Sequence, residues 1–380
     1  MRAAWYFVLL CFAFAEDELK LAEPCDPEVC KLPDCRCSST LIPGDLHPAR
    51  TPQFVLLTFD DAVAVTNMPN YKRLLFGRKN SNQCPIGTTF FVSHEYTNYQ
   101  LVNELYNEGF EIALHSISHM NQTYFENADY ETLMREFSDQ AELMAHFAAL
   151  PIHDMQGVRM PFLQMAGNAS FQMMKSAGLY YDISMPTISF TNPGMWPYTL
   201  DYASTQDCVI PPCPTASIPG VWVVPMISWT DLQGFPCGMA DSCFSPPDGN
   251  DEHGWFRFIV ENFERHYLGN RAPFPFYLHE SYFRDRPGFE AVNAAEAIDW
   301  IRNPVPIGEY VNQPCRFFMQ QRCRPSVCGP LTAPHKTVRY TSRNPNACHA
   351  SPTYYVCVGP LLLLQDRSSY LLLRKIKILR

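Results

Sequence analysis

The chain has little positive charge for its length. Lys and Arg number 29 against 38 Asp and Glu in 380 residues, so the formal net charge is −9 and the pI is about 5.7. Proteins that bind nucleic acid or anionic membrane surfaces concentrate basic residues. The charge balance therefore argues against both kinds of partner, and a neutral or cationic polymer is a better match.

Long apolar runs are also missing. Residues 1–15 are mostly apolar but too few to cross a bilayer. They have the features of a secretory signal, with a positive Arg2, an apolar stretch and a small-x-small cleavage site at Ala13 to Ala15. No internal repeat or low-complexity tract interrupts the remainder. We therefore expect a secreted chain that begins near Glu16 and has no membrane span.

Cysteine, by contrast, is frequent. Of the 15 cysteines, Cys11 falls in the signal segment and leaves 14, and an even number in a secreted chain indicates disulfides. We predict that the four N-terminal cysteines pair among themselves; a zinc knuckle is the less favoured alternative, because they contain no Cys-x2-Cys spacing. The groups are Cys25, Cys30, Cys35 and Cys37; Cys208 and Cys213 with Cys237 and Cys243; and Cys315, Cys323, Cys328, Cys348 and Cys357.

Short apolar runs alternate with stretches of helical periodicity from residue 54 to residue 301. This alternation predicts an α/β domain with a parallel, barrel-like sheet. In the longest predicted helix, Leu133, Phe137, Ala141, Met144 and Ala148 keep a three-to-four spacing. The predicted strands are 54–59, 87–93, 110–114, 157–159, 179–183, 221–229 and 274–279, and the predicted helices are 70–76, 99–108, 130–149, 168–177, one around 256–263, and 289–301.

Two acidic residues, Asp60 and Asp61, follow directly on the apolar strand 54–59. Parallel α/β folds gather catalytic groups at the carboxyl ends of their strands. Successive strand residues point to opposite sides, so one carboxylate can bind a metal while the other faces a substrate. Taken alone, such a pair more often caps a strand and starts a turn.

Two histidines, His115 and His119, follow the predicted strand 110–114. On a helical turn, residues four apart point to one side and can bind one metal. Taken alone, the pair is equally typical of surface or core histidines. Together with one Asp it would complete a three-ligand site that leaves room for water and suits zinc.

In sequence order these motifs resemble the polysaccharide deacetylases of carbohydrate esterase family four. The resemblance rests on the two histidines and on the segments 57–62 (LTFDDA), 159–162 (RMPF) and 278–279 (LH). The flanking sequence is similar to that of secreted arthropod chitin deacetylases. It is most similar to the short insect group without a chitin-binding module, which is often found in the gut. The similar segments are 89–99 (TFFVSHEYTNY), 181–187 (YDISMPT) and 196–202 (WPYTLDY).

The resemblance implies a fold and a set of site residues. The fold is a distorted parallel (β/α) barrel with about seven strands and disulfide-stapled extensions at both ends. The family also has an Asp that tunes its acid histidine; the candidates are Asp182 and Asp231, and we prefer Asp231 because the strand 221–229 would place it at a strand end. The implied roles are Asp60 as base, His279 as acid, Arg159 beside the base, Asp61, His115 and His119 as metal ligands, and Pro161, Phe162, Asp182 and Trp196 along the substrate groove.

The resemblance further implies a zinc-dependent hydrolase that removes N-acetyl groups from chitin to give chitosan and acetate. Cobalt is an alternative metal. We expect a monomer secreted to the extracellular space, with the gut peritrophic matrix as a candidate location. One alternative is a non-catalytic chitin-binding or matrix-organising protein on the same fold, and another is a deacetylase of a different acetylated glycan.

The expected organisation has five parts. The tail is either a membrane-surface segment or the product of an imperfect gene prediction, and we favour the latter. Two sequons, at Asn121 and Asn168, are candidate glycosylation sites. The parts are a signal peptide (1–15), a Cys- and Pro-rich extension (16–52), a catalytic domain (53–305), a Cys-rich extension (306–360) and an apolar, basic tail (361–380).

Overall fold

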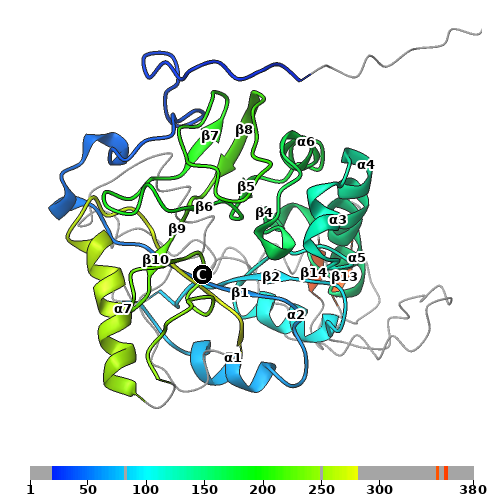
Figure 1. Cartoon of the computed structure of the whole chain (residues 1–380). Helices are drawn as coiled ribbons and strands as arrows, with labels where there is room; N and C mark the ends of the chain where they lie inside the picture. The colour runs from blue at the N-terminus through cyan, green and yellow to red at the C-terminus, as the bar shows by residue number, and fades with distance from the viewer. Residues whose placement is uncertain (1–18, 81–83, 249–250, 281–347, 351–354, 358–380) are drawn as a thin grey trace, which may run out of the picture.

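The main sheet has eight strands in the order β12-β1-β2-β3-β4-β5-β8-β7 (Figure 1). Six parallel pairings link β12 through β8, and β7 joins β8 antiparallel. Among the described residues no pairing joins β12 to β7, so the hydrogen-bonded ladder is open. The predicted α/β fold with about seven parallel strands is confirmed. The computed structural model describes residues 19–80, 84–248, 251–280, 348–350 and 355–357.

Each predicted strand overlaps strand structure, with one correction, and β6, β7, β11, β13 and β14 were not predicted. The stretch 221–229 is not one strand, because Pro225 lacks the N–H that a continuous ladder needs, and the chain divides there into β8, β9 and β10. The strands are β1 Val55–Asp60, β2 Thr89–Val92, β3 Glu111–Leu114, β4 Gly157–Val158, β5 Tyr181–Asp182, β6 Pro186–Thr187, β7 Tyr198–Leu200, β8 Ile218–Val223, β9 Met226–Ile227, β10 Trp229–Thr230, β11 Pro236–Cys237, β12 Phe274–Leu278, β13 Cys348–Ala350 and β14 Tyr355–Cys357.

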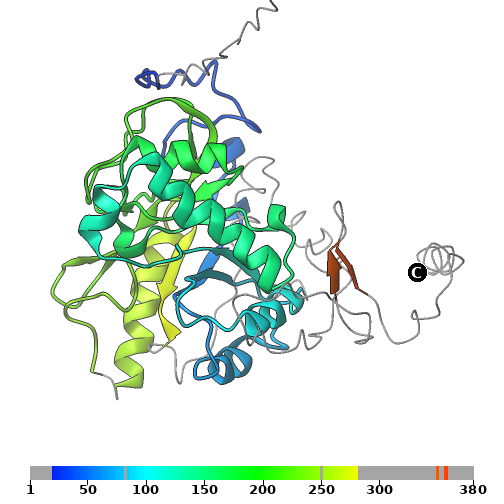
Figure 2. The ribbon, with the colours of Figure 1, turned by 90° about the vertical axis from the view of Figure 1, so that its right-hand side faces the viewer.

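Helices cover the outside of the sheet (Figures 1 and 2). The predicted helix 130–149 contains a π-helical segment, η3, between α4 and α5, and its predicted apolar face is buried. The predicted helix 289–301 lies outside the described residues. No helix in the described ranges combines the length and apolar character needed to cross a membrane. The helices are α1 Met68–Leu75, α2 Tyr99–Asn107, α3 Gln122–Glu126, α4 Tyr130–Leu133, η3 Met134–Ser138, α5 Asp139–Phe147, α6 Asn168–Ser176 and α7 Glu252–Tyr267, with short 3-10 turns Pro43–Asp45, Pro48–Arg50, Ile152–Asp154 and Pro161–Leu163.

The alternation of β1 divides the core into two clusters. Val55, Leu57 and Phe59 pack among residues of the surrounding helices. Phe54 and Leu56 belong to the second cluster, which contains side chains of neighbouring strands and therefore fills the inner side of the sheet. By the same period of two, the side chains that follow on the inner face at the carboxyl end of β1 are polar.

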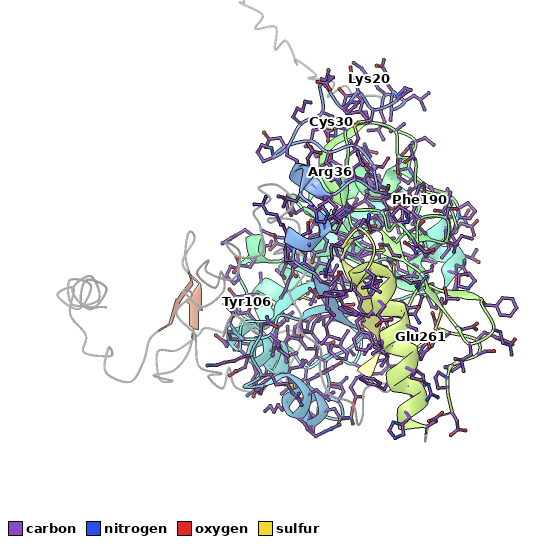
Figure 3. All side chains as sticks on the ribbon, turned by 90° about the vertical axis from the view of Figure 1, so that its left-hand side faces the viewer. Lys20, Cys30, Arg36, Tyr106, Phe190 and Glu261 are labelled. Carbon is purple, nitrogen blue, oxygen red and sulfur yellow. A yellow bond between two sulfur atoms is a disulfide. The ribbon has the colours of Figure 1, made fainter. Side chains whose placement is uncertain are left out.

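The N-terminal extension lies against β7 and the loop before β8. Isolated bridges pair Leu21 with Ala216 and Ser39 with Trp196, and the backbone of Arg36 exchanges hydrogen bonds with Thr199. Figure 3 shows the extension approaching the body of the domain from Lys20 through Cys30 to Arg36. Its four cysteines pair among themselves, as predicted, in the disulfides Cys25–Cys37 and Cys30–Cys35. Two further disulfides are Cys208–Cys213 and Cys237–Cys243.

A buried histidine in α7 gives the fold an acid-sensitive element. His266 is almost fully buried, its Nδ1 donates to the carbonyl of Ala272 at 2.9 Å, and burial lowers its pKa to about 4. Between that value and the unfolded pKa of about 6.5, the unfolded chain binds more protons than the folded one. Lowering the pH through this window therefore removes stability on the order of 3 kcal/mol.

Replacing His266 with Asn should flatten the acid side of the stability curve, because Asn can keep the donor to Ala272 but does not titrate. The measurement is the free energy of urea unfolding at several pH values from 7 to 4. Exposed His153 replaced with Asn is the control and should leave the slope unchanged. Equal pH slopes in wild type and His266→Asn would contradict the assignment.

Candidate functional site

The inner face of the sheet ends in a buried ion pair. Arg159, which follows β4 and is fully buried, donates from Nη1 to Asp60 Oδ1 at 2.6 Å and to Thr58 Oγ1 at 2.8 Å. Its Nε donates to the carbonyl of Ile183, and its guanidinium lies between the rings of Phe91 and Tyr277. Arg159 therefore fixes Asp60 from inside the fold and does not itself line an open groove.

Asp61, His115 and His119 lie together next to this pair. Asp61 Oδ1 is 3.7 Å from Nε2 of His115 and 3.3 Å from Nε2 of His119. Donors on a tetrahedron with bonds of about 2.0–2.2 Å lie roughly 3.3–3.6 Å apart. Two imidazole nitrogens and one carboxylate oxygen at these separations therefore suit a divalent metal such as zinc.

The backbone conformation that brings these three residues together differs from the predicted one. The two histidines do not lie on a helical turn: the segment between them is irregular, and Ser116 and His119 have positive φ of 72° and 43°. Asp61 also has a positive φ, 79°, so it leaves the pleat at the end of β1. The predicted grouping is present, but these backbone bends produce it instead of helical periodicity.

Hydrogen bonding and burial prepare His115 to act as a ligand. Its Nδ1 donates to the carbonyl oxygen of Arg159 at 2.8 Å, which leaves the lone pair on Nε2, the nitrogen that faces Asp61. Burial lowers the pKa of His115, against the opposite effect of Asp60 and Asp61. The neutral imidazole is the form that binds metals, and a hydrogen bond at the second nitrogen orients metal-binding histidines.

A residue missed by the sequence analysis holds the loop between the histidines. Glu136, buried in η3, accepts hydrogen bonds from the backbone of Ile117 and Ser118 at 3.0 and 2.9 Å and from Ser118 Oγ at 2.7 Å. Gln140 adds a contact from its Nε2 to the carbonyl of Ser116. π-helical segments are frequent at functional sites, so η3 would have pointed to Glu136. The periodicity of apolar residues does not distinguish a π-helical segment from an α-helix, and the sequence analysis therefore missed Glu136.

His279 follows β12 and lies next to Asp61 of the cluster. Its Nε2 is 3.7 Å from Asp61 Oδ2. Asp241 Oδ2 accepts from both the backbone N–H and Nδ1 of His279, at 2.6 and 2.8 Å. The hydrogen bond to Asp241 raises the pKa of His279 to about 9, outweighing partial burial, and the Asp60 and Asp61 charges add to the rise.

The prediction that Asp231 tunes His279 is wrong, and so is the alternative Asp182. Asp231 follows β10, which pairs with β11 outside the main sheet because the strand divides at Pro225. Its carboxylate accepts backbone N–H groups of Gln233, Phe235 and Ser245, which lowers its pKa and fixes that hairpin. The partner of His279 is Asp241, in an irregular loop where strand patterns give no signal.

Only Phe162 of the four predicted groove residues is exposed. Phe162 is 49% exposed, and the centroid of its ring lies 5.1 Å from that of His119. Asp182 is buried, accepts from the N–H and Oγ of Ser184, and has its pKa raised to about 7 by burial. Trp196 is buried on the inner side of the sheet and Pro161 is buried beside Phe162. Asp182, Trp196 and Pro161 therefore support the fold and do not line a groove.

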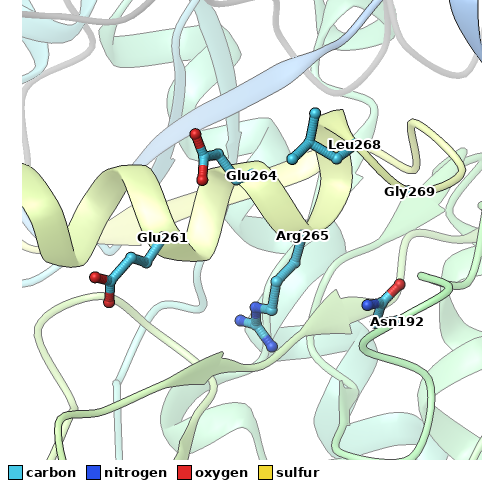
Figure 4. Close-up of a pocket in the computed structure, with 6 residues that line it drawn as sticks. All are labelled: Asn192, Glu261, Glu264, Arg265, Leu268 and Gly269. Carbon is cyan, nitrogen blue, oxygen red and sulfur yellow. The ribbon is translucent and has the colours of Figure 1, made fainter.

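A surface pocket at the end of α7 contains none of these site residues. Figure 4 shows it lined by Asn192, Glu261, Glu264, Arg265, Leu268 and Gly269. Arg265 is already engaged there, donating to Asn262 Oδ1 and to the carbonyl of Ser228. The candidate site is therefore the edge of the sheet where β1, β3, β4 and β12 end.

The fold and this edge define an α/β protein with a candidate metal site of one aspartate and two histidines at the carboxyl end of its parallel sheet. Comparisons with known proteins give the family. A family profile described as polysaccharide deacetylase matches residues 47–181. The chain is 56% identical to Chitin deacetylase 8 of Bombyx mori, over 93% of this chain and 96% of that protein. It is 35% identical to Chitin deacetylase 1 of Bombyx mori, over 77% of this chain and 59% of that protein.

A solved family 4 carbohydrate esterase from Streptomyces lividans aligns with 36% of this chain and 65% of its own, at 18% identity and a TM-score of 0.28. That likeness is too low to support a functional argument. Chitin deacetylase 8 of Bombyx mori, matched over 96% of its length, shows the family. The chain belongs to the polysaccharide deacetylases, among their chitin deacetylase members.

Proposed function

We propose that this protein is a metal-dependent hydrolase that removes N-acetyl groups from chitin and gives chitosan and acetate. The observation that carries the proposal is the arrangement at the sheet edge. Asp61, His115 and His119 offer a metal site, the Asp60–Arg159 pair adjoins it in the chain, and His279, held by Asp241, lies 3.7 Å from Asp61. Filled acid, base and metal positions favour an enzyme over a non-catalytic chitin-binding protein.

Asp61, His115 and His119 would hold the metal, with zinc as the first choice and cobalt as the alternative. Bound there, the ion would supply Lewis acidity for the acetyl carbonyl and for water. Asp60 accepts the proton of the attacking water. Because Arg159 contacts Oδ1, the second oxygen, Oδ2, is the one that can take it.

His279 supplies a proton to the departing amine. An amide is a reluctant substrate because its nitrogen leaves only when protonated, and the raised pKa of His279 keeps the imidazole protonated at neutral pH. Asp241 occupies Nδ1, so Nε2 is the nitrogen that faces the cluster and donates. Phe162, exposed beside His119, provides an apolar surface against which a sugar ring can pack.

The proposal extends to setting and organisation. Disulfides are consistent with an oxidising compartment, and we propose a secreted monomer that meets chitin outside the cell, with the gut peritrophic matrix as one location. Residues 53–305 would form the catalytic domain, between the Cys-rich extensions 16–52 and 306–360. The predicted signal (1–15) and tail (361–380) lie outside the described residues.

The proposed function is tested with purified protein loaded with zinc and incubated with chito-oligomers. Mass spectrometry should show stepwise loss of acetyl groups and release of acetate, abolished by a chelator and restored by added zinc. Acetylated xylo-oligomers form a parallel arm: deacetylation there and none of chitin would favour the other-glycan alternative. Tight binding of chito-oligomers with no acetate release by the metal-loaded protein would favour the non-catalytic alternative.

Secreted proteins can be glycosylated at sequons, and the two sequons of this chain differ in exposure and hydrogen bonding. Asn121 and Thr123 are exposed, and Asn121 uses only its Oδ1 locally, as the cap of α3. Asn168 uses Oδ1 and Nδ2 to contact Thr215, and Ser170 of its sequon is fully buried. A glycan on Asn168 would break these contacts.

We therefore predict that protein secreted from eukaryotic cells carries a glycan on Asn121 and not on Asn168. The measurement is peptide mapping after enzymatic glycan removal in heavy-oxygen water. Asn121→Gln should remove the glycan-dependent shift in electrophoretic mobility, and Asn168→Gln should leave it. A glycan found on Asn168 alone would refute the prediction.

A further inference from the structure

The loop that carries Asp241 is closed by a disulfide. Cys237 and Cys243, at a sequence separation of 6, are bonded to each other, and Asp241 lies between them. Within the loop, Ser242 N donates to the carbonyl of Met239 at 3.1 Å, and Ser242 Oγ contacts both polar backbone atoms of Met239. The loop is thus a short closed turn with Asp241 near its tip.

One end of this loop is fixed to the core. Cys237 in β11 pairs with Trp229 of β10. Trp229 donates from its indole nitrogen to the carbonyl of Pro275 at 2.7 Å and stacks on Phe274 and Phe276 of β12. The first cysteine of the loop therefore has a fixed place relative to the strand that ends at His279.

The other end is held by the disulfide and, two residues beyond it, by Ser245, whose backbone N–H donates to Asp231 Oδ2 at 2.9 Å and whose carbonyl accepts from Leu232 N–H at 3.1 Å. Phe244, directly after Cys243, is 81% exposed and adds little packing. Ala240 N donates to the carbonyl of Tyr277 at 2.8 Å, and Asp241 accepts from His279, so the tip of the loop lies along the end of β12. Joining Cys243 to Cys237 limits the positions that Asp241 can adopt, since a covalent closure of a short loop removes most of its alternatives.

We infer that the Cys237–Cys243 disulfide is a positioning element for the proposed deacetylation. The disulfide holds the Asp241 carboxylate in the place where that carboxylate orients the imidazole of His279 toward the proposed metal ligands. The inference rests on the proposed function and adds to it a dependence on the redox state of one disulfide. Opening this bond leaves Asp60, Asp61, His115 and His119 in place. It impairs only the step in which His279 protonates the leaving group.

The test uses the full chain with Cys237→Ser and Cys243→Ser together. On chito-oligomers, kcat should fall about tenfold or more, since general acid catalysis contributes about 10²- to 10⁴-fold, while KM and zinc content stay near wild type. Hydrolysis of 4-nitrophenyl acetate should be retained, because nitrophenolate leaves without a proton. The matched control is Cys208→Ser with Cys213→Ser, which opens a disulfide of separation 5 in another loop and should change neither rate.

A direct readout separates this inference from the proposed function. The proton on Nδ1 of His279, bonded to Asp241, should give a downfield proton NMR signal in wild type and in the control pair, absent in His279→Gln and lost when Cys237–Cys243 is opened. If wild type released no acetate, the proposed function would fail and this signal would still decide the positioning. If the double variant does not fold, partial reduction of wild type, with peptide mapping of the opened bond, gives the same comparison.

The inference is overturned if the opened loop keeps the signal, or if the rates on chito-oligomer and aryl ester fall by the same factor. Adding Asp241→Asn to the opened loop supplies one more check. If the disulfide acts through Asp241, the two changes together should lower kcat little more than either alone. Fully additive losses would show that the disulfide acts elsewhere.

Discussion

Replacing Asp60 with Asn is expected to slow acetate release from chito-oligomers by about 10²- to 10⁴-fold while the metal is retained. Asn keeps the volume of Asp60 and can still accept from Arg159, but it cannot take a proton from water. Breaking a buried ion pair costs about 3–5 kcal/mol, and the remaining hydrogen bond offsets part of that cost. Zinc content, thermal midpoint and acetate release are measured on the same preparation.

Asp61→Asn is the matched partner, a neighbouring residue with the same chemical change. Asp61 is about half exposed and lies between the two histidines, so its loss should remove most of the bound zinc with little effect on the Asp60–Arg159 pair. Metal lost in Asp60→Asn and kept in Asp61→Asn would show that the two roles are reversed.

Replacing His279 with Gln is expected to lower kcat on chito-oligomers by a similar factor, about 10²- to 10⁴-fold, with zinc content unchanged. Gln can keep a contact with Asp241 but carries no transferable proton. The reaction with 4-nitrophenyl acetate should be affected far less, because its leaving group needs no acid. Both rates are measured with zinc-loaded protein at neutral pH.

His94→Gln is a suitable control for His279→Gln, since that imidazole contacts Tyr99 and lies outside the cluster. It should alter neither rate. An equal loss on the amide and the ester in His279→Gln would indicate that His279 acts in binding the acetyl group or the metal. The assignment of His279 as the acid would then be wrong.

Most of the fold followed from the sequence because its signals are local. Apolar runs gave β1, β2, β3 and β12, and the face of helix 130–149 was predicted residue by residue. The error at 221–229 came from reading an apolar run as continuous across Pro225. The same error led to the wrong choice of Asp231 as the partner of His279, because the argument for Asp231 depended on a single long strand.

The parts of the site that could be predicted are those attached to strand ends in a motif. Asp60, Asp61 and His115 follow predicted strands, Arg159 is the last residue of one, and the structure places them together. Asp241 and Glu136 could not be found, because each acts from an irregular loop or a π-helical segment through tertiary contact. The one available hint for Asp241 was its place between two closely spaced cysteines.

The backbone at the metal cluster has a consequence for how this sequence is constrained. Asp61, Ser116 and His119 adopt positive φ, a conformation that costs a residue other than glycine about 1–3 kcal/mol. Selection for folding alone would favour glycine at each of these positions. Glycine at Asp61 or His119 would relieve this strain but remove a side chain proposed to bind the metal, so stability and activity oppose each other at these two positions.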